Sequence, residues 1–273
     1  MFACPVCGGR LKENRFGLAC KKGHRFDAAA QGYVNLLSAR HDPGNAGDNA
    51  MMVAARTAFL ETGHYRKLAD RLAETAASLL KDTPDAEVID CGCGEGYYTN
   101  ICAAALPEVS FYGIDLAKSG VRHAAAAAKS AGISNVRFAA ASAFELPFAD
   151  RSADLLLSVF APVAGEEYKR VLKKGGKLVI VSPSPEHLFG MKGVLYEKPY
   201  KNRPNVYDLK GFAEAGSERL EYDITLGSHR QIMDLYTMTP YYYKTPAGGR
   251  ERLEALETLD TRVGFEIMTF RKK

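Results

Sequence analysis

The sequence contains no long apolar run. Its 273 residues are 47% hydrophobic, yet no stretch approaches the roughly 18 consecutive apolar residues that a membrane-spanning helix needs. The first residues, Met-Phe-Ala-Cys-Pro, also lack the basic region and the apolar stretch of a secretory signal peptide. We therefore expect a cytoplasmic globular protein with one large domain, or with one domain and a small module.

Cysteine is sparse and is not arranged as in a secreted protein. The six cysteines form two groups, Cys4, Cys7 and Cys20 near the start of the chain and Cys91, Cys93 and Cys102 further on. Neither group resembles the disulfide framework of a small extracellular domain. The second group is most simply interpreted as buried packing thiols.

The net charge of +4 is too small to indicate a nucleic-acid partner by itself. Its distribution is more informative, because residues 1–40 contain seven Lys or Arg side chains against two acidic ones, Glu13 and Asp27. A basic surface confined to a terminal module favours phosphate binding, since Lys and Arg release counterions from a nucleic acid. An ordinary solvated charged surface is the alternative.

The first group of cysteines has the spacing of metal ligands. Cys4, Cys7, Cys20 and His24 follow the pattern C-x2-C-x12-C-x3-H. Two close pairs of sulfur and nitrogen donors suit a tetrahedral zinc ion. A redox Cys-x-x-Cys motif is the alternative, but it normally opens a helix in a βαβ unit and would leave Cys20 and His24 unexplained. Because four protein ligands leave no open position, we expect structural zinc.

A second motif joins a short apolar strand to a glycine-rich turn. Residues 88–99 read Val-Ile-Asp-Cys-Gly-Cys-Gly-Glu-Gly-Tyr-Tyr-Thr. Alternating glycines let the backbone approach a ligand closely, and the following helix offers free N–H groups. A dinucleotide loop would need glycine where Tyr97 stands, and no Gly-Lys-Ser/Thr follows for a P-loop. The motif predicts a nucleotide-cofactor site, and a glycine turn without a ligand is the alternative.

Short apolar runs alternate with helix-compatible stretches from residue 87 onward. This alternation indicates βαβ units and a doubly wound, mostly parallel α/β sheet. The predicted strands are residues 88–91, 111–115, 136–140, 154–160 and 177–182, with final antiparallel strands at 222–226 and 265–270. We also expect a loop at residues 41–48, a helix after it, and a helix over residues 65–80.

The glycine loop resembles the first motif of S-adenosylmethionine (SAM) methyltransferases, an apolar residue followed by Asp-x-Gly-x-Gly-x-Gly. The resemblance implies that residues 141–148 border the adenine and that Ala161-Pro162, at the end of the fourth strand, lies near the transferred methyl group. Asp115, at the end of the second strand, would hold the ribose, and a helix N-cap is its alternative role. The residues expected at the cofactor are Asp90, Gly92, Gly94, Glu95, Gly96, Tyr97, Tyr98, Asp115, Ser142 and Ala143.

Several motifs together resemble one family, the 23S ribosomal RNA (guanine-N1)-methyltransferases of the RlmA type. They are the zinc spacing, Gln31-Gly-Tyr33-Val-Asn35, Asp42-Pro43-Gly44, Met51-Met52-x-x-x-Arg56, Gly63-His64-Tyr65, the glycine loop and Met238-Thr239-Pro240, and they cover nearly the whole chain. The resemblance implies methyl transfer from SAM to N1 of a guanine in a 23S rRNA hairpin, and a homodimer. We expect a zinc-binding RNA-recognition module at residues 1–40, a linker with helices at 41–80 and a SAM-dependent methyltransferase domain at 81–273.

The sequence does not single out a general base for guanine N1, whose proton must leave before methyl transfer. His187 and Glu186, just beyond the fifth strand, are candidates, and surface loop positions are the alternative. The tyrosines at 241–243 would stack a splayed-out base or pack internally.

Two alternative functions stay open at this point. The chain could be a small-molecule SAM methyltransferase whose zinc module serves assembly, or a non-catalytic RNA-binding protein that keeps the SAM pocket. The end of the fourth strand, Phe160-Ala161-Pro162, supplies neither the cysteine nucleophile of cytosine-C5 enzymes nor the polar residue of adenine-N6 enzymes. Those two chemistries are therefore disfavoured.

Overall fold

The computed structural model describes residues 2–37 and 48–273. The predicted loop at 41–48, apart from Asp48, lies outside the described residues, as do Asp42-Pro43-Gly44 and Arg40. No helix among the described residues is long and apolar enough to cross a membrane.

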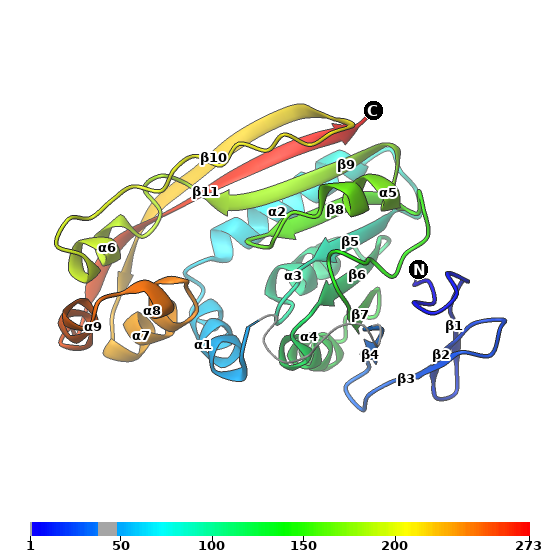
Figure 1. Ribbon diagram of the computed structural model, residues 1–273, viewed down its shortest axis with the longest axis horizontal. Coiled ribbons are helices and arrows are strands. Elements are labelled where there is room, and N and C mark those ends of the chain that lie inside the picture. Colours follow the sequence, from blue (N-terminus) through cyan, green and yellow to red (C-terminus); the bar gives the residue numbers. More distant parts are fainter. Residues whose placement is uncertain (1, 38–47) are drawn as a thin grey trace.

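The centre of the molecule is an eight-stranded sheet with the order β10-β11-β9-β8-β5-β6-β7-β4 (Figure 1). Its strands are β4 Val34–Asn35, β5 Glu87–Cys91, β6 Ser110–Asp115, β7 Val136–Ala140, β8 Ala153–Val159, β9 Leu172–Pro183, β10 Phe212–Leu226 and β11 Leu259–Lys272. Strands β4 to β9 run parallel, and β10 and β11 are antiparallel. The mostly parallel α/β sheet predicted from the sequence is confirmed.

The order of the parallel strands reverses between β5 and β8. The chain passes from β5 outward to β6 and β7, and then returns to place β8 on the other side of β5. The crevice at the carboxyl ends of the strands, at such a reversal, is where open α/β sheets bind their ligands. The glycine loop follows β5 and therefore lies at this crevice.

Two apolar cores cover the two faces of the sheet, because neighbouring strand residues point to opposite sides. Val88 packs into one core and Ile89 into the other. The first core is closed by α2 Arg66–Leu80, α3 Tyr97–Ala105 and α4 Lys118–Ser130. The second core is closed by α5 Gly165–Val171 and by residues from the start of the chain.

The remaining helices lie around one end of the antiparallel strand pair β10 and β11, which α7 to α9 connect, or pack between that end and the crevice. They are α1 Ala50–Glu61, α6 Phe189–Leu195, α7 His229–Thr237, α8 Tyr241–Lys244 and α9 Ala247–Glu254. Figure 1 shows α6 to α9 at one end of the molecule and the N-terminal residues beside β4 and β7 at the other. Helix α1, whose Asn49 cap accepts a hydrogen bond from the Met52 N–H, packs on α7.

The N-terminal module, residues 2–35, is built on a small antiparallel sheet of β1 Lys12–Asn14, β2 Gly17–Ala19 and β3 Arg25–Asp27. Its last strand, β4, pairs with β7 and so becomes an edge strand of the central sheet. The Phe2 ring packs against the rings of Tyr112 and Phe148, with centroids 5.4 and 5.3 Å apart. The module is therefore docked on the sheet through both pairing and apolar contact, which the sequence patterns did not predict.

Candidate functional site

The predicted zinc ligands meet in space. The ligand atoms of Cys4, Cys7, Cys20 and His24 all lie within 4.8 Å of one another. The Sγ atoms of Cys7 and Cys20 are 3.7 Å apart, and His24 Nδ1 lies 3.5 and 3.3 Å from the Sγ atoms of Cys4 and Cys20. Zinc bonds of about 2.3 Å to sulfur and about 2.0 Å to nitrogen, in a tetrahedron, require ligand separations of about 3.5–3.8 Å. The four side chains thus fit zinc.

The local backbone explains why these four side chains converge. Each pair flanks a tight turn, closed by hydrogen bonds from the Gly8 N–H to the Cys4 carbonyl and from the Gly23 N–H to the Cys20 carbonyl. Although burial raises it, hydrogen bonds from the backbone of His24 and Lys22 lower the pKa of Cys20 to about 6. A thiolate, the form that binds zinc, is therefore favoured at this position.

The second site begins at the glycine loop between β5 and α3. Gly92 and Gly96 have φ angles of +83° and +79°, in the left-handed region that favours glycine. A Cβ at Gly92 would lie 2.5 Å from the Cβ of Ala161, and one at Gly96 would lie 2.5 Å from the Cβ of Ala124. Glycine is therefore required at both positions for the loop to pack against the end of β8 and against α4.

A cavity of about 340 Å³ opens beside this loop at the carboxyl ends of β5, β6 and β8. Seven of the ten predicted cofactor residues line it: Gly92, Gly94, Glu95, Tyr98, Asp115, Ser142 and Ala143. Phe144, Phe160, Ala161 and Pro162 complete the wall on the sides of β7 and β8. The cavity therefore joins three loops that the sequence associated with one ligand.

The other three predicted cofactor residues stand outside the cavity wall. Asp90 is buried beneath the loop, where its Oδ2 accepts a 2.5 Å hydrogen bond from Thr99 Oγ1 and where burial raises its pKa to about 7. Gly96 begins α3. Tyr97 lines a different groove, between α2, α3 and α4.

Asp115 lies on the cavity wall with both carboxylate oxygens engaged. Its Oδ2 accepts a hydrogen bond of 3.0 Å from the Gly94 N–H, and its Oδ1 accepts one of 2.7 Å from the Ala117 N–H at the start of α4. Burial raises the pKa of Asp115. Each oxygen keeps a second lone pair for a ligand hydroxyl, so the capping role and the ligand role are compatible.

An ion-pair network closes the cavity from the side of α1. Arg56 donates from Nε to Glu95 Oε2 at 2.6 Å and from Nη1 to Asp48. These two carboxylates raise the pKa of Arg56 further above its usual value, against the effect of burial. Among the described residues of the wall, Arg56 is the one cationic side chain, and it faces three carboxylates, with Asp115 the third. The sequence motif around Met51-Met52 contained Arg56 but gave it no role.

His187 and Glu186 do not form part of the cavity wall. His187 is buried behind it, where Nδ1 accepts a hydrogen bond from the Gly264 N–H and Nε2 lies 3.4 Å from the Tyr65 hydroxyl. Burial lowers the pKa of His187 to about 3, so the imidazole is neutral at physiological pH. Glu186 forms an ion pair with Lys201. Of the two, His187 contacts the cavity wall from behind, through the Tyr65 hydroxyl and the Phe160 ring.

The three neighbouring tyrosines form helix α8 and connect it to α1. Tyr243 accepts a hydrogen bond of 3.0 Å from Asn49 Nδ2, and its hydroxyl contacts the sulfur of Met52. None of the three lies on the cavity wall, although Met238, at the end of α7, does. Their position links the cap of α1 to the C-terminal helices.

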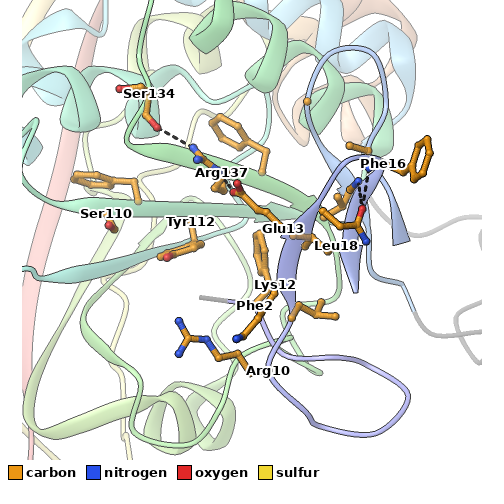
Figure 2. A pocket seen from close by; sticks show the side chains of 18 of the residues that line it. Phe2, Arg10, Lys12, Glu13, Phe16, Leu18, Ser110, Tyr112, Ser134 and Arg137 are labelled. Atoms are coloured by element: carbon orange, nitrogen blue, oxygen red, sulfur yellow. Dashed lines mark hydrogen bonds and ion pairs between the residues drawn. The ribbon is translucent and has the colours of Figure 1, made fainter. Parts of the chain in front are cut away.

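A separate groove of about 810 Å³ lies between the N-terminal module and the sheet (Figure 2). Arg10, Lys12, Arg15 and Phe16 border it from the module, and Arg137 borders it from β7. Figure 2 shows Arg137 held by hydrogen bonds to Glu13 and to the Ser134 carbonyl. The groove opens at the amino ends of β6 and β7, opposite the cavity at their carboxyl ends.

Comparisons with known proteins match both parts of the chain. A family model described as "RlmA, N-terminal" matches residues 2–43, and one described as "Methyltransferase domain" matches residues 82–222. In fold, the YcgJ protein of Bacillus subtilis superposes with a TM-score of 0.51 at 18% identity, over 76% of this chain and 99% of that chain.

Curated relatives extend over almost the whole length. The 23S rRNA (guanine(748)-N(1))-methyltransferase of Streptomyces fradiae is 37% identical over 87% of this chain and 84% of its own. A protein of Micromonospora griseorubida, provisionally named a 23S rRNA (guanine-N(1)-)-methyltransferase, is 34% identical over 93% of this chain and 90% of its own. With its zinc ribbon, its methyltransferase fold and these relatives, the chain belongs to the family of 23S rRNA (guanine-N1)-methyltransferases.

Proposed function

We propose that this protein transfers the methyl group of SAM to N1 of a guanine in 23S ribosomal RNA, in the cytoplasm. The proposal rests on two features that occur together in one chain. One is the cluster of four zinc ligands, and the other is the cavity beside the glycine loop, where the strand order reverses. SAM, when bound, supplies an electrophilic methyl group on its sulfonium. The chain has to hold that donor, keep water out and admit one base.

The residues of the cavity support the binding of such a donor. The α-carboxylate of a bound methionine moiety needs a cation, and Arg56 is the cation on the described wall. Its ammonium group needs acceptors, which Asp48 and Glu95 provide. Asp115 is placed to accept from ribose hydroxyls, and Ser142 and Ala143 are placed to border the adenine. We assign these roles as proposals for the individual residues.

The N-terminal module supports the RNA part of the proposal. Its described Lys and Arg side chains, Arg10, Lys12, Arg15, Lys21, Lys22 and Arg25, are all exposed. Zinc, when bound, fixes the turn that carries Lys21 and Lys22 and the turn that precedes Arg10. Strand β4 fixes the module to the sheet. This basic surface would contact RNA phosphates. Such contacts fix the position of the RNA but do not recognise its bases. A homodimer, as the family resemblance implies, is part of the proposal, and sedimentation equilibrium tests it.

Incubation of purified protein with tritiated SAM and undermethylated 23S rRNA tests the function. We expect label in the RNA, mapped by mass spectrometry to N1 of one guanine. Label that enters only small molecules would support a small-molecule methyltransferase instead. SAM binding without any transfer would support the non-catalytic RNA-binding alternative.

A further inference from the structure

Phe160 combines two features that are unusual for a phenylalanine. It follows β8 with a φ angle of +54°, in the left-handed region that residues with a Cβ rarely adopt. Its side chain is also 43% exposed, although it lies on the wall of the cavity. Backbone strain of this kind persists where the surrounding structure imposes it, and it is concentrated at functional sites.

Phe160 lies where the glycine loop contacts the end of β8. The next residue, Ala161, brings its Cβ against the open face of Gly92, where any side chain on Gly92 would collide. The Phe160 N–H donates to the Val181 carbonyl at 3.0 Å, which fixes the backbone against β9. Phe160 is thus held beside the place where a donor on the glycine loop faces its acceptor.

A cluster of buried rings supports the Phe160 ring from the protein side. Its centroid lies 5.9 Å from that of Phe265 and 6.2 Å from that of His187. Tyr65 closes the cluster, 5.0 Å from Phe265. Because the His187 ring is held between the Gly264 N–H and the Tyr65 hydroxyl, this backing is rigid. The exposed part of the Phe160 side chain is therefore available to contact a ligand in the cavity.

We propose that Phe160 stacks on the nucleobase that receives the methyl group, which rests on the function proposed above. A phenyl ring has no donor or acceptor, so it contacts the face of a base and leaves the N1 edge free. Stacking on aromatic side chains is the usual way in which proteins hold an unstacked base. The predicted ligand of this subsite is a purine taken out of its RNA stack.

The test compares Phe160→Ala and Phe160→Tyr with the unchanged protein on undermethylated 23S rRNA. We expect Phe160→Ala to lower kcat/KM for the RNA by about 10- to 100-fold, and Phe160→Tyr to retain most of it. Calorimetric affinity for S-adenosylhomocysteine should stay within about 3-fold in both variants. Val206→Ala, which removes an exposed apolar side chain away from the cavity, is the matched control with unchanged turnover.

A second measurement reports stacking directly, in the protein–RNA complex. In an RNA hairpin with 2-aminopurine at the mapped target position, binding to the unchanged protein should leave the fluorescence quenched, and binding to Phe160→Ala should leave it brighter. Equal turnover and equal fluorescence in the alanine variant would overturn the inference. A loss confined to S-adenosylhomocysteine affinity would also overturn it, by placing Phe160 at the sulfonium. If the unchanged protein transfers no methyl group to the RNA, the proposed function itself fails.

Discussion

At the scale of single residues, the proposed binding of the methyl donor rests on the charge balance around Arg56. Its guanidinium is shared between Glu95, which is only 5% exposed, and Asp48. Removing the cation would leave a buried carboxylate without its partner, beside a ligand that carries its own carboxylate. Such losses are costly because the low-dielectric surroundings do not screen the remaining charges.

We therefore predict that Arg56→Ala weakens the binding of S-adenosylhomocysteine at least about 10-fold. Arg56→Lys should have an intermediate affinity, because lysine keeps the charge but lacks the forked guanidinium geometry. Isothermal titration calorimetry measures both. The ion pair between Arg66 and Asp70, exposed on α2, gives the matched control: Arg66→Ala should bind the ligand normally. An Arg56→Ala variant with unchanged affinity would remove Arg56 from the cofactor site.

At the scale of elements, the zinc ribbon and the edge strand β4 together hold the N-terminal module on the central sheet. The cluster orders the turns at residues 4–9 and 20–24, and β4 ties the end of the module to β7 through Val34 and Asn35. Cys4 and Cys20 are also buried in the same apolar core as Phe2 and Phe148. Loss of zinc should consequently disturb this edge of the sheet more than the crevice at β5 and β8.

The corresponding prediction concerns Cys7→Ser, at the ligand that is half-buried, whereas Cys4 and Cys20 are fully buried. The variant should lose bound zinc and most RNA methylation, because serine is a poor ligand and the basic surface loses its support. Its affinity for S-adenosylhomocysteine should remain measurable. Metal analysis, calorimetry and tritium transfer check the three outcomes, and full RNA turnover in the zinc-free variant would show that the ribbon is dispensable.

At the scale of the whole molecule, charge is distributed unevenly. The net charge of the chain is +4, and the basic side chains of the N-terminal module account for the excess. The groove that Arg10, Lys12 and Arg15 border opens at the amino ends of β6 and β7, whereas the cavity opens at the carboxyl ends. An RNA that occupies both must extend around this edge of the sheet, as expected for a structured substrate and not for a small molecule.

We predict that replacing Arg10 and Lys12 together by glutamine weakens RNA binding and reduces its salt dependence. The slope of log K against log salt concentration should become shallower by about 1.5, because two phosphate contacts are lost. Filter binding at several salt concentrations measures the slope. Lys81→Gln, at the exposed residue that follows α2, is the control. An equal slope in the double variant would exclude this surface from RNA binding.

The sequence by itself determined those features that depend on neighbours along the chain. The zinc ligands lie within one short stretch, so their spacing and the turns between them fix the cluster. The parallel strands and the glycine loop follow likewise from local periodicity and from the need for left-handed backbone at Gly92 and Gly96. These expectations required no knowledge of how distant segments pack.

Only the tertiary structure decided which distant side chains share the cavity. Arg56 meets Glu95 across 39 positions of sequence, and Phe160 gains its strain and its supporting rings from contacts with β9 and β11. The burial that holds His187 behind Tyr65, and the docking of the N-terminal module through Phe2 and β4, arise in the same way. No local pattern encodes such contacts, because their free energy comes from apolar surface and ion pairs that exist only once the sheet has assembled.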